Sequence, residues 1–178
     1  MCVPEATGFI IASRVGNIKA LSRRIDETRM PPSRTLVWGT ANPEGMTGTY
    51  KGVYLNTADV SSMVEQVGQA NRMGTPIPVK LEHTGVPLGR VVSAWERKGT
   101  LECVLEIDEG VLEGSISAAF LRSGICKDLS LGYTIDMEQS KKTGVIQAKR
   151  KKLNEVSLVV KGARRNCNVH GISKKALL

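Results

Sequence analysis

The sequence has few of the features that mark membrane, secreted or metal-binding proteins. No apolar run approaches the roughly 20 residues needed to span a bilayer. The N-terminus lacks the basic region and apolar run of a signal peptide. The four cysteines, Cys2, Cys103, Cys126 and Cys167, form no C-x-x-C pair, which argues against a zinc site and favours free thiols. We therefore expect a soluble, intracellular protein with no membrane association and no metal or other cofactor.

Aromatic residues make up only 4% of the 178 residues, and the chain has two histidines. A chain of this length is expected to form a single domain, 1–178, with a substantial core. Glycines fall between short apolar runs, which favours many short strands over long helices. We expect an α+β, mainly β fold, namely a mostly antiparallel, closed β-barrel of about seven strands with peripheral helices.

The chain is basic, with a formal net charge of +8. A basic balance favours acidic partners, including nucleic acid. The basic residues have no interleaved aromatic residues and no known binding motif, so any nucleic-acid binding is expected to be non-specific. A solvated loop and tail would explain the charge equally well. Much of it lies in four clusters, at 141–142, 149–152, 164–165 and 174–175.

Hydrophobic periodicity predicts the order of elements. Apolar runs and alternating patterns predict strands at 7–13, 35–38, 52–55, 77–83, 101–107, 128–135 and 153–160. Helical spacing predicts helices at 17–30, from Asn56 or Thr57 to Gly74, and at 111–123 with Leu112, Ile116, Ala119 and Phe120 on one face. Residues 138–152 are interpreted as a polar, basic connection and 167–178 as a short C-terminal tail.

The segment around His83 is the first candidate for chemistry. Ile77, Val79 and Leu81 alternate with polar residues and proline, which predicts that His83 ends a strand on its apolar face, before a turn and a returning strand. An imidazole at the end of a buried strand is a candidate general base. A core or turn histidine with one satisfied hydrogen bond is the alternative.

Ser130, in Leu-Ser-Leu-Gly-Tyr, and Glu155, in Asn-Glu-Val-Ser-Leu-Val, complete a candidate set of serine, histidine and acid. A serine hydroxyl needs an adjacent base to act as a nucleophile. Each residue also has an ordinary interpretation, as a strand serine that faces solvent or an exposed acid beside the basic run. Spacing cannot bring the three together, because such sets occur in any chain order.

The order of these segments resembles the capsid maturation proteases of tailed phages (prohead proteases) and of herpesviruses (assemblins). The resemblance covers residues 75 to 170. Its elements are a histidine between two strands, a further strand and helix, a Leu-Ser-Leu core, and a strand with an acid before an arginine-bearing turn. In this sequence the corresponding residues, in the same order along the chain, are 81–91, 99–104, 111–124, 129–133, 155–159 and 162–165. Assemblins carry histidine at the third position, so Glu155 is closer to the phage type, whereas the paired arginines are closer to the herpesvirus turn.

The resemblance implies a serine endopeptidase with Ser130 as nucleophile, His83 as base and Glu155 as the acid that orients His83. It places Arg164 and Arg165 in a turn beside the oxyanion site, where a backbone N–H or a held water would contribute. His170 is the rival third member.

The resemblance also implies a biological role. The substrates would be scaffold and shell proteins of a viral procapsid, and self-cleavage from a longer precursor is expected. The herpesvirus branch suggests a homodimer. The protein would act inside the procapsid, in the host cytoplasm for a phage or the host nucleus for a herpesvirus. The rival hypotheses are a non-catalytic basic β-barrel module that binds nucleic acid or an acidic scaffold segment, and a degenerate protease fold that serves as a scaffold.

Overall fold

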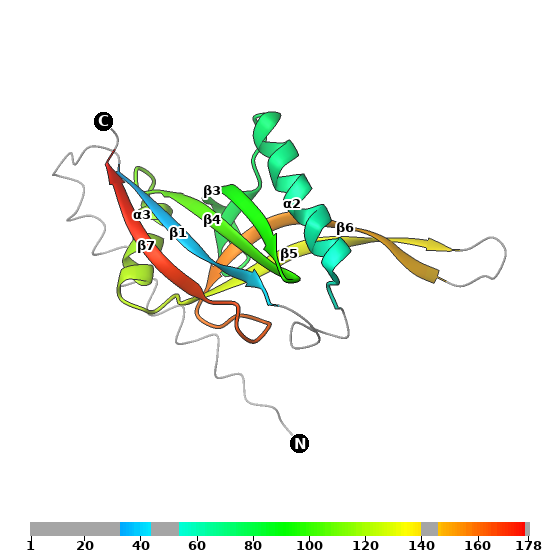
Figure 1. Cartoon of the computed structure of the whole chain (residues 1–178). Helices are drawn as coiled ribbons and strands as arrows, with labels where there is room; N and C mark the ends of the chain where they lie inside the picture. Colours follow the sequence, from blue (N-terminus) through cyan, green and yellow to red (C-terminus); the bar gives the residue numbers. More distant parts are fainter. Residues whose placement is uncertain (1–32, 44–53, 140–145, 177–178) are drawn as a thin grey trace, which may run out of the picture. The chain divides into compact units, whose positions relative to one another are not determined.

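The computed structural model describes residues 33–43, 54–139 and 146–176. The chain divides into two compact units, Met1–Pro31 and Pro32–Leu178, and the first lies outside the described residues, together with the strand and helix predicted there. The described part of the second unit holds seven strands and two helices (Figure 1). They are β1 (Ser33–Asn42), α2 (Thr57–Arg72), β2 (Pro78–Leu81), β3 (Thr84–Arg97), β4 (Thr100–Asp108), α3 (Leu112–Arg122), β5 (Asp128–Gln139), β6 (Ile146–Val159) and β7 (Val169–Ala176).

The seven strands form one mixed sheet in the order β5-β6-β2-β3-β4-β1-β7. Neighbouring strands are antiparallel except β2 and β6, which run parallel. The prediction of a mainly β fold with seven strands and accompanying helices is confirmed. The parallel pair brings the β2–β3 turn next to the end of β6.

The predicted closure of the sheet into a barrel is wrong. Closure would require a continuous ladder between the two outermost strands, β5 and β7. Among the described residues, the start of β5 contacts the chain at the start of β7 through an isolated bridge between Asp128 and Asn168, with backbone hydrogen bonds from Leu129 to Cys167 and from Val169 to Lys127. Beyond that bridge β5 pairs along its length with β6, and β7 pairs with β1. Because the described residues form no continuous ladder between β5 and β7, the sheet stays open.

The core follows the alternation in β4. Leu101, Cys103, Leu105 and Ile107 are buried, as their period of two predicts. Glu106, on the opposite face, is buried as well, because it accepts hydrogen bonds from the guanidinium groups of Arg34 and Arg90 on the flanking strands. A buried carboxylate is tolerated when it is paired in this way.

The two helices differ in how well the pattern predicts them. In α2 the predicted helical spacing is confirmed, because Val60, Met63 and Val67 are buried, and Asn56 forms a capping box with Asp59. In α3 the predicted face is wrong, because the buried residues are Gly114, Ser117, Ala118 and Leu121. A Cβ at Gly114 would lie 1.9 Å from the carbonyl oxygen of Asp108, so the helix approaches the sheet through its small residues.

Three segments differ from their predicted conformation. Residues 138–152 are not wholly a connection, because β5 continues to Gln139 and β6 begins at Ile146; Figure 1 shows the ends of these strands as a two-stranded ribbon. The tail at 167–178 contains β7, which pairs with β1. Within the predicted strand 52–55, the described residues 54–55 are irregular. Neither helix described here has the length and apolar character required to cross a membrane.

Candidate active site

Ser130 lies on β5, at one edge of the sheet, directly opposite Ser157 of β6. Its neighbours Leu129 and Leu131 point into the core, so Ser130 points to the other face, as the alternation of β5 predicts. The alternative of a strand serine that faces solvent is wrong, because Ser130 is buried at 6% exposure. The structure therefore covers this serine with other side chains, which come from β6 and from the β2–β3 turn.

His83 lies in the tight turn between β2 and β3 and not on the strand itself. Leu81 pairs with Thr84, and the two residues between them, Glu82 and His83, have φ values of 49° and 60°. Positive φ at both central positions is the type I′ hairpin geometry, which usually requires asparagine or glycine. The prediction that His83 shares the apolar face of the strand is wrong, because the left-handed backbone carries its side chain out of the strand alternation. Its side chain is 41% exposed.

Two hydrogen bonds to β6 and one to the residue that follows it hold this strained turn. The backbone N–H of Glu82 donates to the carbonyl of Leu158 at 3.0 Å, and that of His83 donates to Ser157 Oγ at 3.2 Å. The Glu82 carboxylate accepts from the N–H of Val160 at 2.7 Å. Strained backbone persists where its surroundings determine it strongly, and such positions concentrate at functional sites.

The turn brings His83 between Ser130 and Glu155. Its Nε2 lies 2.9 Å from Ser130 Oγ, and its Nδ1 lies 2.6 Å from Glu155 Oε1. With the proton on Nδ1, the ring donates to the carboxylate and Nε2 accepts from the serine hydroxyl. This is the geometry of a nucleophile, a base and an orienting acid.

The Glu155 side chain crosses over β5 at Gly132, the residue that pairs with it. A Cβ at Gly132 would lie 2.5 Å from Glu155 Cγ, so only glycine leaves room for this path. Ser157 donates to Glu155 Oε1 at 3.1 Å, and Lys80 Nζ lies 3.4 Å from Oε2. Both carboxylate oxygens therefore have partners, which fixes the orientation of the acid.

The two arginines of the turn after β6 differ in burial. Arg164 is buried and donates to the Tyr133 hydroxyl at 2.8 Å, with its guanidinium carbon 5.6 Å from the ring centroid. Arg165 is exposed. The start of the turn is fixed to β5, because the N–H of Gly162 donates to Asp128 at 2.8 Å.

His170, the rival third member of the set, lies elsewhere. Its Nε2 is 2.7 Å from Thr40 Oγ1 and 3.8 Å from Glu102, and its ring packs against Trp38. The structure brings Glu155 next to His83 and gives His170 a different environment.

Sequence reasoning missed Ser157, Lys80 and Gly132. Ser157 shares the face of Glu155 by strand alternation, and Gly132 shares the face of Ser130, so both signals were present in the pattern. The contribution of Lys80 depends on the parallel pairing of β2 with β6, in which Lys80 lies opposite Ser157. Long-range pairing of this kind has no local signature.

The cysteines take no part in this site. Among the described residues Cys103, Cys126 and Cys167 are free and buried. Desolvation by burial raises the pKa of Cys103 and Cys167 to about 12 and that of Cys126 to about 11. The described residues contain no group of three or more histidine, cysteine or acidic side chains that could hold a metal ion.

Comparison with known proteins gives a fold relationship. No protein-family model and no curated protein matches this sequence. Among solved structures the chain is similar to the protease of KSHV, in a crystal structure with a hexapeptide phosphonate inhibitor, at 14% sequence identity and a TM-score of 0.50. The match covers 80% of this chain but only 65% of the viral chain. The chain therefore has a viral protease-like fold.

Proposed function

We propose that this chain is a serine endopeptidase with Ser130 as nucleophile, His83 as general base and Glu155 as the orienting acid. The observation that carries the proposal is the continuous relay of hydrogen bonds from Ser130 through His83 to Glu155. The strained turn that holds His83 and the glycine that admits Glu155 support it further, since both serve the relay at a cost to local backbone freedom.

The proposed reaction begins with transfer of the Ser130 hydroxyl proton to His83 Nε2 as Oγ attacks the carbonyl carbon of the scissile peptide bond. The Glu155 carboxylate stabilises the imidazolium through Nδ1–H, and Ser157 and Lys80 hold the carboxylate in place. His83 then donates the proton to the leaving amine, which departs and leaves an acyl ester on Ser130. Water, deprotonated by His83, hydrolyses the ester and restores the serine.

The oxyanion of the tetrahedral intermediate needs donors close to Ser130. We assign this role to the turn that carries Arg164 and Arg165, through a backbone N–H or a water that it holds. The hydrogen bonds of Arg164 to Tyr133 and of Gly162 to Asp128 support the assignment, because they attach this turn to the strand of the nucleophile.

The proposed substrates are scaffold and shell proteins of a viral procapsid, together with the chain's own precursor. This part of the proposal is supported by the resemblance of residues 75 to 170 to capsid maturation proteases and by the viral protease-like fold. The protein would act inside the procapsid as a homodimer, in the cytoplasm or nucleus of the host.

The test is labelling with a fluorophosphonate probe, followed by peptide mapping. We expect the wild-type protein to be labelled at Ser130, and the Ser130→Ala and His83→Ala variants not to be labelled. His170→Ala is the matched control, because it removes the other histidine of the chain and should leave labelling intact.

The proposal would be wrong if the wild-type protein were not labelled at high protein concentration in a structure-promoting salt, or if His83→Ala were labelled as fast as the wild type. Salt-sensitive DNA binding by an unlabelled protein would favour the non-catalytic basic module instead. Thermal unfolding of each variant shows whether a loss of labelling reflects chemistry or misfolding.

A further inference from the structure

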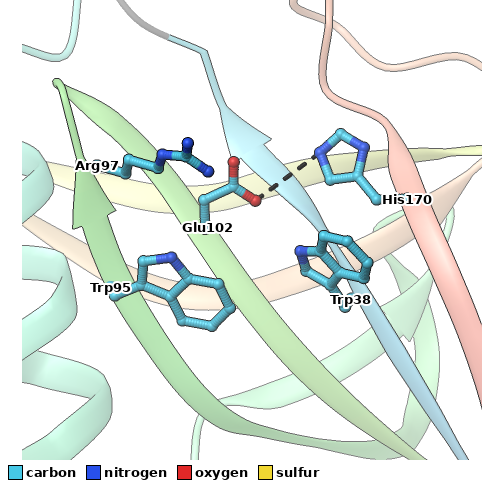
Figure 2. A pocket seen from close by; sticks show the side chains of 5 residues that line it. All are labelled: Trp38, Trp95, Arg97, Glu102 and His170. Atoms are coloured by element: carbon cyan, nitrogen blue, oxygen red, sulfur yellow. Dashed lines mark ion pairs between the residues drawn. The ribbon is translucent and has the colours of Figure 1, made fainter.

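Both tryptophans of the chain lie on the solvent-facing side of the sheet, on β1 and β3, whereas Ser130 and Glu155 lie on β5 and β6. Trp38 on β1 is 49% exposed and Trp95 on β3 is 37% exposed. Figure 2 shows them on either side of Glu102 in a shallow pocket of about 450 Å³, whose other lining residues are Arg97 and His170. Exposed large apolar side chains that lie together beside polar groups are typical of interaction sites.

Strand register explains why these side chains share a face. Glu102 on β4 lies opposite Trp95 on one side and Thr40 on the other. Trp38 is two residues from Thr40 along β1 and therefore points the same way. Its ring lies over Gly171 of β7, where a Cβ would be 3.1 Å from the ring, so the neighbouring strand leaves the tryptophan room to lie flat.

The two oxygens of Glu102 differ in their hydrogen bonds. Its side chain is 14% exposed, and Oε1 accepts from Thr40 Oγ1 at 3.1 Å. The other oxygen, Oε2, is buried without a hydrogen-bond partner among the described residues. His170 Nε2 lies 3.8 Å from Oε2, which is the ion pair drawn in Figure 2, and 2.7 Å from Thr40 Oγ1, so its hydrogen bond goes to the threonine. A buried carboxylate oxygen without a donor is costly, and a bound donor would remove that cost.

We infer that this pocket binds a cationic side chain, arginine or lysine, of a peptide partner. The faces of two tryptophans attract a cation through their quadrupoles, and the carboxylate of Glu102 supplies a charge-assisted acceptor. The side chain would lie between Trp38 and Trp95 with its charged end directed towards the Glu102 carboxylate. This inference does not depend on the proposed peptidase activity.

Arg97 distinguishes this occupant from other ligands that stack on tryptophan. Figure 2 shows its guanidinium directed towards Glu102, and no ion pair joins the two residues. Arg97 would compete with a cationic ligand for the Glu102 carboxylate, because its guanidinium carries the same charge and extends towards the same group. For a sugar or a nucleic acid it would be a hydrogen-bond donor or a phosphate partner. Removal of Arg97 therefore has opposite effects on the two kinds of ligand.

The experiment is a titration followed by the two tryptophan indole N–H signals in ¹H–¹⁵N spectra, which report on this pocket alone because the chain has no other tryptophan. The probe is the capped tripeptide Gly-Arg-Gly, with capped Gly-Gln-Gly as the neutral comparison. We expect saturable shifts of both indole signals with the arginine peptide only.

Glu102→Gln should weaken binding at least about tenfold, equivalent to about 1.4 kcal/mol. Glu65→Gln, an equal change of charge on an exposed residue of α2, should leave binding unchanged. Trp95→Ala should abolish binding of the arginine peptide, which keeps the test valid if Glu102→Gln fails to fold. Arg97→Ala should strengthen it. The inference is overturned if the wild-type protein gives no saturable shift, if Glu102→Gln binds as well as the wild type, or if Arg97→Ala weakens binding.

Discussion

Replacement of Ser157 by alanine tests how far the candidate relay depends on the strand that supports it. Ser157 is fully buried, and its hydroxyl makes two hydrogen bonds that serve His83. It donates to Glu155 Oε1 and accepts from the backbone N–H of His83 in the strained turn. The substitution removes both bonds and leaves Ser130, His83 and Glu155 in the chain.

The size of the effect can be worked out from these bonds. A hydrogen bond to a charged group contributes about 1.5–3 kcal/mol. If the full amount is lost from the transition state, the reaction of Ser130 slows about 10- to 150-fold. If it is lost from folding, the melting temperature falls by about 3–12 °C in a protein of this size. The Ser157→Ala variant should therefore be slower and less stable than the wild type.

The assay is the rate of fluorophosphonate labelling at Ser130, measured beside the melting temperature. Ser117→Ala is the matched control, because Ser117 is equally buried but lies on α3, where its hydroxyl donates to the Glu113 carbonyl. It should lose stability and keep the wild-type labelling rate. If Ser157→Ala also keeps that rate while it loses stability, Ser157 has only a structural role and the reasoning is refuted.

Two other predictions concern Gly132 and the cysteines. Gly132→Ala should reduce labelling of Ser130 by at least about tenfold, because the new Cβ would displace Glu155 from its path. Gly68→Ala on α2 is the control and is expected to raise stability by up to about 1 kcal/mol. Unchanged labelling of the Gly132→Ala variant would contradict the assigned role of Glu155. Burial raises the pKa of Cys103 and Cys167 from the usual 9.0 to about 12. The unfolded chain therefore loses its thiol protons first as the pH rises, and the free energy of unfolding should fall between pH 9 and about 12. Chemical denaturation across this range measures the fall, and a flat profile would show that these thiols are not buried.

Local patterns predicted the elements whose burial is regular. The alternation in β4 and the stripe of α2 have one face in the core and the other in solvent, which is the condition under which periodicity is informative. The pattern failed at α3, where the helix approaches the sheet at Gly114 and buries small residues instead of large ones. It also failed at β7, whose strand character comes from pairing with β1.

In the candidate site, too, local sequence predicts some features and long-range pairing sets the others. The residue types of Ser130, His83 and Glu155 could be selected from the sequence because nucleophilic chemistry requires a hydroxyl, a base and an acid. Their distances could not, since they depend on the parallel pairing of β2 with β6 and on the left-handed turn at His83. Residues 72 positions apart meet there only through the sheet.

Composition and alternation alone establish that this protein is basic and mainly β, and that it has a serine, a histidine and an acid in separate strand-like segments. The tertiary structure decided that the sheet stays open, that His83 leaves its strand to lie between the other two residues, and that Trp38 and Trp95 flank the same carboxylate. The physical reason is that composition and period act over a few residues, whereas register and strand order are set by which distant backbone groups pair with one another.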